Sequence, residues 1–154
     1  QQEIGDKSHR GFAMQASSGL LSPDHYMYNP NPLSYAFSPE KARAIIESVG
    51  YEKGADGYYQ KPGQPLKIEL LSSNITVAGQ SVADRDGEVI KKQLEQVGIK
   101  VELLHLEQAT TDSKVKSWNF DLAVSGHGGV SGDARILNEM VSSKYGAGSV
   151  NSAR

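Results

Sequence analysis

The stretch EVIKKQLEQVGIKVELLHL, Glu88–Leu106, decides the fold because it places a helix directly before a strand. Its first half repeats apolar residues at helical spacing, which predicts a helix over residues 83–97. The apolar face of that helix consists of Val89, Ile90, Leu94 and Val97. Gly98 is suited to the left-handed conformation that ends a helix, and residues 99–106 then predict a strand.

An earlier helix precedes this unit in the chain. Ser38 is a good N-cap, Pro39 fits the first helical position, and Gly50 is placed to end the helix. The apolar face of this helix consists of Ala42, Ile45, Ile46 and Val49. The segment therefore predicts a second amphipathic helix.

Between the two helices the chain is first turn-rich and then apolar. The clusters around Tyr58 and Tyr59 predict a small hairpin or an Ω-like loop. LKIELL, residues 66–71, predicts a strand. We expect the following SSNITVAGQS, residues 72–81, to be a loop.

Downstream, strand and helix signals continue to alternate. We expect a weak helix over residues 107–116, a short strand over 121–125 and a last helix over 133–143. This order predicts an α/β domain with a layered mixed or largely parallel sheet flanked by helices. In such sheets ligands bind outside the carboxyl ends of the strands, which draws attention to the loop after Ser125.

Composition bounds the possible functions. The chain has 154 residues, which is the size of one ordinary domain. Its formal net charge is −2, so the composition does not indicate the excess of positive charge that is typical of nucleic-acid-binding domains. It contains no cysteine, so disulfides and thiolate metal sites are excluded. No apolar run approaches the roughly 18 residues of a membrane span, and we expect no signal peptide in this stretch.

We expect three regions along the chain. Residues 1–37 are rich in Pro, Ser, Asn and Tyr, which predicts an extended N-terminal segment that packs on the domain. Residues 38–143 would form the α/β ligand-binding lobe, and residues 144–154 a flexible end. The first residue is Gln1, and we expect the chain to be a piece of a longer protein.

Several segments resemble a known family. FSPEKARAIIESVGYEKGADGYYQKPGQPLKIELL, residues 37–71, is similar to a recurrent segment of the peptide- and nickel-type (family 5) extracellular solute-binding proteins of ABC importers. EVIKKQLEQVGIKVEL is similar to the family's next helix and strand, and WNFDLAVSGHGG to its following strand and loop. The resemblance extends from about Gly11 to Val141.

The resemblance implies a fold and a function. This chain would be the second ligand-binding lobe of a two-lobed receptor of the periplasmic-binding-protein type. Its partners would be a small solute such as a peptide or nickel complex, the missing first lobe, and the membrane permease of the importer. It would act outside the cytoplasm, in the periplasm or lipid-anchored at the cell surface, and it would bind solute without catalysis, cofactor or metal.

The resemblance also implies which residues line the solute cleft. In FDLAVSGHGGVSGDARIL, residues 120–137, a glycine-rich loop follows the last strand. The residues carried over from the family's loop are Gly126, His127, Gly128, Gly129, Val130 and Asp133. His127 replaces a tryptophan common in the family, and no carboxylate stands near Val130, where peptide-binding members place one for the solute's amine. Asp133 is the candidate substitute.

Four interpretations of this loop remain open. Its glycines let backbone N–H groups approach a solute closely, and His127 can donate or accept a hydrogen bond. Cleft lining is the interpretation we favour; the alternatives, in decreasing order, are a tight strand-to-helix turn, a phosphate cradle, and metal ligation or catalysis. The phosphate cradle leads to an alternative function, a Rossmann-like enzyme domain that uses residues 126–132 for a phosphate or cofactor, although no lysine follows at P-loop spacing. A third class of function is an interaction module that binds no small ligand.

The remaining histidines do not form a recognisable motif. His9 and His25 lie in the irregular N-terminal segment, and His105 lies in a predicted strand. No H-E-x-x-H or comparable spacing joins them. We therefore predict surface or core roles for these three residues.

Overall fold

The structure is a computed structural model of the whole chain, and it describes residues 2–12, 21, 23–33, 35–77, 79–124, 137–138 and 142–145. For residues 75–77, 80–83 and 145 it describes the backbone alone. The chain divides into two compact units. One contains residues 36–108 and 120–124, and the other contains residues 1–35, 109–119 and 125–154.

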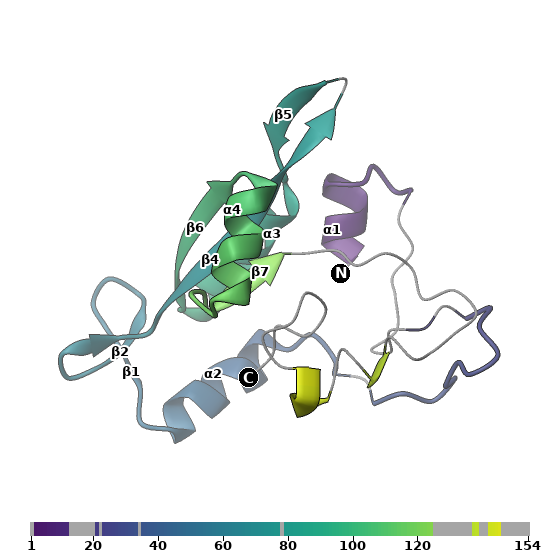
Figure 1. Cartoon of the computed structure of the whole chain (residues 1–154). Coiled ribbons are helices and arrows are strands. Elements are labelled where there is room, and N and C mark those ends of the chain that lie inside the picture. Colours follow the sequence, from purple (N-terminus) through teal and green to yellow (C-terminus); the bar gives the residue numbers. More distant parts are fainter. Residues whose placement is uncertain are drawn as a thin grey trace. The chain divides into compact units, whose positions relative to one another are not determined.

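A parallel sheet forms the centre of the first unit (Figure 1). Its middle strand β4, Lys67–Val77, pairs in parallel with β6, Lys100–Leu106, and with the short β7, Leu122–Val124. Apolar residues line both faces of β4, where Leu70 and Leu71 are 1% and 0% exposed. A strand buried on both faces is typical of a parallel sheet covered on both sides.

The second half of β4 corrects one prediction. Residues 72–81 do not form the expected loop, because β4 continues to Val77 and turns back as β5, Gln80–Ala83. The two strands pair antiparallel from Asn74 opposite Ala83 to Val77 opposite Gln80. In Figure 1 this hairpin extends beyond the parallel part of the sheet. Gly79, at φ +78, supplies the left-handed residue at the turn.

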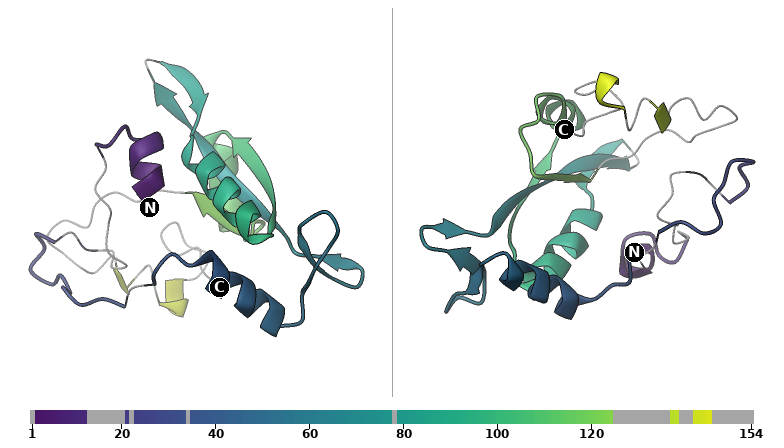
Figure 2. Two further views of the ribbon diagram at one scale, coloured as in Figure 1. Left: turned by 180° about the vertical axis from the view of Figure 1, so that it is seen from behind. Right: turned by 90° about the horizontal axis from the view of Figure 1, so that it is seen from below.

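Helix α3, Asp86–Val97, packs on β4 and β6, as both views in Figure 2 show. It begins three residues later than predicted because Ala83 belongs to β5. Gly98 ends it in the left-handed conformation, at φ 107, as predicted. The buried residues between helix and sheet are Leu70, Val89, Val97 and Val101.

The first turn of α3 lies unusually close to the sheet. A Cβ added to Gly87 would lie 2.9 Å from Cδ1 of Leu103, 3.0 Å from Cβ of Ser72 and 3.1 Å from its Oγ. Real Cβ atoms almost never approach other atoms so closely. Glycine at this position and serine on β4 therefore allow the helix to rest directly on the strand.

Helix α2, Pro39–Ser48, begins as the sequence predicts. Oγ of Ser38 accepts a hydrogen bond from the backbone N–H of Lys41 at 3.2 Å, and Pro39 is the first helical residue. The helix contacts α3, and a guanidinium nitrogen of Arg43 donates to the carbonyl oxygen of Gln96 at 3.1 Å. The predicted N-cap and helix are confirmed.

A three-stranded antiparallel sheet follows α2. Its strands are β1, Glu52–Lys53, β2, Tyr59–Lys61, and β3, Gln64–Pro65. Tyr59 connects this small sheet to the helices: its backbone N–H donates to the carbonyl of Gly98 at 2.8 Å, and its hydroxyl donates to Oε1 of Glu47 at 2.6 Å. The side chain is 1% exposed. The turn-rich segment is thus anchored to the ends of α2 and α3.

The Tyr59 contact predicts a loss of stability in alkali. The hydrogen bond to the Glu47 carboxylate, burial, and the negative charge of Glu47 all raise the pKa of the Tyr59 phenol. Because the unfolded phenol ionises first, at its ordinary pKa of about 10, the contribution of Tyr59 is complete below that pH and is lost as pH rises toward the folded pKa. Between about pH 9 and 11, urea titrations should show a steeper fall in unfolding free energy for the wild type than for Tyr59→Phe. Parallel curves would contradict this account, since both proteins keep the other tyrosines.

The second unit contains helix α1, Gln2–Lys7, and the 3-10 helix η1, Ser143–Tyr145, and it contains helix α4, Gln108–Lys116, from Ala109 onward. Helix α1 corrects the prediction that the N-terminal segment is extended throughout; Nζ of Lys7 and Oε1 of Glu3 form an ion pair one turn apart at 2.5 Å. Helix α4 confirms the predicted weak helix. Of the predicted last helix, the structure describes Leu137 and Asn138, which are helical, Ser142, which is outside any helix, and Ser143, which belongs to η1.

Among the residues described, no helix combines the length and the apolar composition needed to cross a membrane. The predicted division into residues 1–37, 38–143 and 144–154 stays a prediction.

Candidate ligand-binding site

Strand β7 delivers the chain to the predicted ligand-binding loop. It pairs with the middle of β4, Leu122 opposite Leu70 and Val124 opposite Ser72. Just before it, Oδ2 of Asp121 accepts a hydrogen bond from the backbone N–H of Glu69 at 2.8 Å. This contact and the short ladder fix where β7 ends on the sheet.

The predicted site itself follows β7 immediately. Its six residues, Gly126, His127, Gly128, Gly129, Val130 and Asp133, all lie outside the described residues. The role of this loop therefore stays a prediction, and the described part of the site is the sheet edge from which the loop departs.

That edge is formed by the carboxyl ends of β6 and β7 on either side of β4, which itself continues beyond them to Val77. His105 near the end of β6, Ser72 of β4 and Val124 at the end of β7 are consecutive register partners. Register partners in parallel strands direct their side chains to the same face of the sheet. These three side chains therefore form one row on the face that α3 covers, because Gly87 of α3 lies against Ser72.

One interaction at this edge was not predicted from the sequence. Nε2 of His105 lies 3.2 Å from Oε1 of Glu88, in the first turn of α3. The side chain of His105 is 28% exposed and that of Glu88 is 62% exposed. The two residues are 17 positions apart in the chain. The predicted helix and strand both contained them, but only the packing of α3 on β6 shows that they meet.

Two buried polar atoms belong to the same row. Oγ of Ser72 and Nδ1 of His105 are buried and have no hydrogen-bond partner among the residues that the structure describes. Ser72 is 0% exposed. Together with the Glu88–His105 pair, they add polar groups to a helix–sheet interface whose buried apolar residues include Leu70 and Val89.

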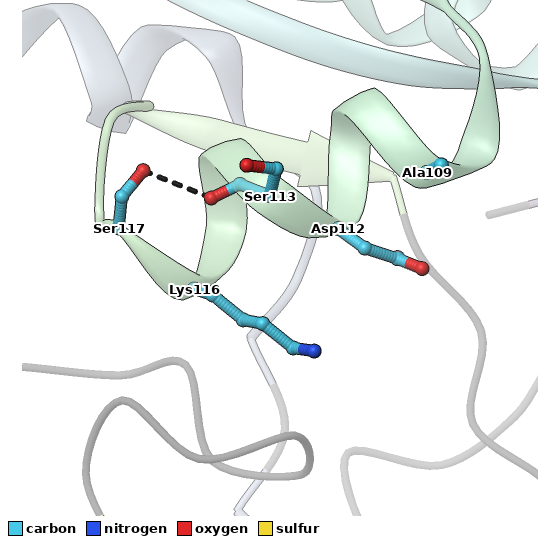
Figure 3. Close-up of a pocket in the computed structure, with 5 residues that line it drawn as sticks. All are labelled: Ala109, Asp112, Ser113, Lys116 and Ser117. Atoms are coloured by element: carbon cyan, nitrogen blue, oxygen red, sulfur yellow. Dashed lines mark hydrogen bonds between the residues drawn. The ribbon is translucent and has the colours of Figure 1, made fainter.

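A separate hollow of about 620 Å³ lies along α4 in the second unit (Figure 3). The residues that line it are Ala109, Asp112, Ser113, Lys116 and Ser117. All five come from one helix and its end, and Oγ of Ser117 donates to the carbonyl of Ser113 at 2.9 Å. Its wide opening and single-helix lining make it a weaker candidate for a solute site than the sheet edge.

The described ranges contain no group of three or more His, Asp or Glu side chains arranged to hold a metal ion. The predicted independence of metal and cofactor stays a prediction, because the loop with His127 is not among these residues.

Solved structures share the fold of this chain. The NikZ protein of Campylobacter jejuni, solved with Ni(L-His), superposes with a TM-score of 0.73 at 18% identity over 91% of this chain and 26% of its own. A nickel ABC transporter protein of Bacillus halodurans gives a TM-score of 0.70 at 23% identity over 97% of this chain and 30% of its own. The predicted fold class, a mixed α/β lobe with helices flanking a largely parallel sheet, is confirmed by this likeness.

Sequence comparison points the same way. The dipeptide-binding protein of Escherichia coli is 24% identical over 118 residues, which are 77% of this chain and 20% of that protein. The chain thus spans only about a fifth to a third of the relatives it matches. The sequence model for bacterial extracellular solute-binding proteins, family 5, middle region, matches residues 1–149. This chain belongs to the family 5 bacterial extracellular solute-binding proteins.

Proposed function

We propose that this chain is part of the solute-binding receptor of an ABC importer, in which it forms one wall of the solute cleft. The observation that carries the proposal is the family match over residues 1–149. The described fold is consistent with it, because the end of β7 lies at the carboxyl edge of a parallel sheet, where ligands of such sheets bind. The Rossmann-like enzyme alternative is not favoured by these findings.

In this proposal the chain binds and does not catalyse. The loop that holds Gly126–Asp133 lines the cleft, its glycines permit close approach of the backbone, and His127 forms a directional hydrogen bond to the solute. The other lobe of the receptor closes over the solute and buries it. The closed receptor then docks on the membrane permease, outside the cytoplasm.

Three solute classes follow from proteins of similar fold. NikZ of Campylobacter jejuni was solved with Ni(L-His), an oligopeptide-binding protein of Thermus thermophilus with a pentapeptide, and a periplasmic oligopeptide-binding protein of Thermotoga maritima with mannohexaose. These titrants differ in charge and in hydrogen-bonding groups, so affinity for them separates the classes.

The proposal is tested on the full-length receptor that contains this chain. Native mass spectrometry of the receptor purified from its own host should show a bound small molecule, and calorimetry should show binding of one of the three titrants. His127→Ala should weaken that affinity about tenfold, as expected for loss of a hydrogen bond in a desolvated cleft. His25→Ala, in the N-terminal segment, is the control and should leave the affinity unchanged.

The two-lobe part of the proposal has its own readout. The 154-residue chain alone should bind the same titrant far more weakly than the receptor, because half of the contacts are absent. Equal affinities would contradict a cleft between two lobes, and a receptor that carries no solute and binds none of the titrants would contradict the receptor role.

A further inference from the structure

We propose that the apolar face of α2, formed by Ile45 and Val49, is an internal interface of the receptor and is covered by an apolar segment of the same polypeptide outside residues 1–154. The inference rests on the proposed function in one respect, namely that this chain is part of a longer receptor. It goes beyond that function because it assigns an interaction surface and its partner, and not a solute contact.

The contacts of α2 carry the first step. Side-chain hydrogen bonds attach this helix to α3 and to β2. A guanidinium nitrogen of Arg43 donates to the carbonyl oxygen of Gln96 at 3.1 Å, and Oε1 of Glu47 accepts the hydroxyl hydrogen of Tyr59 at 2.6 Å. Arg43 and Glu47 are one turn apart and therefore lie on the same side of the helix. The side of α2 that contacts its own unit thus carries charged groups.

The apolar side of α2 carries the second step. Ile45 and Val49 are also one turn apart, and each comes two positions after Arg43 or Glu47. Two positions correspond to about 200° around a helix, so the apolar pair lies nearly opposite the charged pair. Ile45 and Val49 are each 56% exposed, and no residue of α2 is buried. A surface helix ordinarily buries its apolar stripe and turns its polar side to water, so the orientation of α2 indicates a partner on its apolar side.

The small size of the face carries the third step, the choice of occupant. Even with Phe37, which is 75% exposed directly before the Ser38 cap, the patch has three large apolar side chains. A stable interface between separate proteins takes about 20 to 30 residues from each side. A segment of the same polypeptide needs fewer contacts, because the covalent connection gives it a high effective concentration. The size of the face therefore favours a tethered occupant over a second copy or a separate protein.

The length of the relatives carries the fourth step. This chain spans only about a fifth to a third of the proteins that it matches, so most of a receptor of their length lies outside it. Ile45 and Val49 offer neither charge nor hydrogen-bonding side-chain groups. A polar segment placed on them would lose its water without gaining partners, whereas apolar side chains gain from burial. The occupant is therefore an apolar segment of that remaining polypeptide.

The test uses the full-length receptor and measures how fast a maleimide modifies a thiol placed on α2. Residues 1–154 contain no cysteine, so Ile45→Cys, Val49→Cys and Ala44→Cys each add one thiol to this region. Ala44 is the matched control because it is exposed and lies outside the apolar face. Relative to the same variant in urea, labelling at positions 45 and 49 should be at least about tenfold slower than at 44, because burial protects a thiol. Mass spectrometry identifies the labelled peptides.

A second measurement on the same receptor identifies the occupant. Val49 is the C-cap residue of α2, so a larger side chain there leaves the hydrogen bonds within the helix in place. Replacing Val49 with the photo-crosslinking residue p-benzoylphenylalanine and irradiating the receptor should join α2 to an apolar peptide of the same molecule from outside residues 1–154. Peptide mass spectrometry gives the position of the cross-link, and the mass of the product shows whether one or two molecules are joined.

The outcomes separate this proposal from its alternatives. Equal labelling at all three positions would overturn it, because the face would then be open in the receptor. A cross-link to residues 1–154 would overturn it in favour of coverage within this chain, and a product of doubled mass would overturn it in favour of a second copy. Calorimetry with solutes tests the proposed function separately. A receptor that protects α2 and binds no solute would keep this interface and lose that function.

Discussion

Replacing Leu70 with alanine should lower the free energy of unfolding of this chain by about 3 to 4 kcal/mol. Leu70 is 1% exposed, and it lies between its register partners Leu103 and Leu122 on the face that α3 covers. Truncation removes apolar burial and leaves a cavity in the middle strand, where both neighbouring strands and the helix resist collapse. Urea unfolding followed by circular dichroism measures the loss.

Leu33→Ala is the control for this prediction. Leu33 is 80% exposed, so the same chemical change should alter the unfolding free energy by less than about 0.5 kcal/mol. If the two variants lost the same stability, the parallel sheet would not be the core of the first unit. A Leu70→Ala chain that is already unfolded without urea would agree with the upper part of the expected range.

Replacing Gly98 with alanine should cost about 3 kcal/mol, for two reasons that add. The residue has φ +107, a conformation that side chains rarely adopt. A Cβ there would also lie 2.8 Å from Cδ2 of Tyr59 and 3.3 Å from the carbonyl oxygen of Gly57. Tyr59 is buried and anchored to Glu47, so it cannot move aside without breaking that hydrogen bond.

Gly63→Ala separates the two causes. Gly63 also has positive φ, +72, but nothing lies within 4 Å of a Cβ built on it. Its substitution should cost only the backbone strain, about 1 kcal/mol. The difference between the two variants in urea unfolding measures the close approach at Gly98. Equal losses would mean that Tyr59 yields to the added methyl group and does not hold the end of α3.

Both predictions concern the packing of α3 on the sheet. Leu70 is buried on the face of the sheet that α3 covers, and Gly98 ends the last turn of the helix. Gly87 and Glu88 lie in its first turn.

The sequence alone determined the features that depend on neighbours in the chain. Helical spacing of apolar residues, the Ser38 cap and the Gly98 stop predicted α2 and the end of α3, and the apolar run of residues 99–106 predicted β6. These signals are local because capping and helical periodicity act within one or two turns. The ordered set of such segments was also sufficient to identify the family.

Only the tertiary structure decided what depends on partners distant in the chain. The sequence predicted a loop over residues 72–81, because the strand character of this segment comes from antiparallel pairing within the β4–β5 hairpin and not from an apolar pattern of its own. The Glu88–His105 pair gave no motif, because its members are joined by the packing of α3 on β6. Whether such a pair can form depends on how closely the helix approaches the strand. Gly87 and Ser72 together determine that distance, and neither residue indicates it in the sequence.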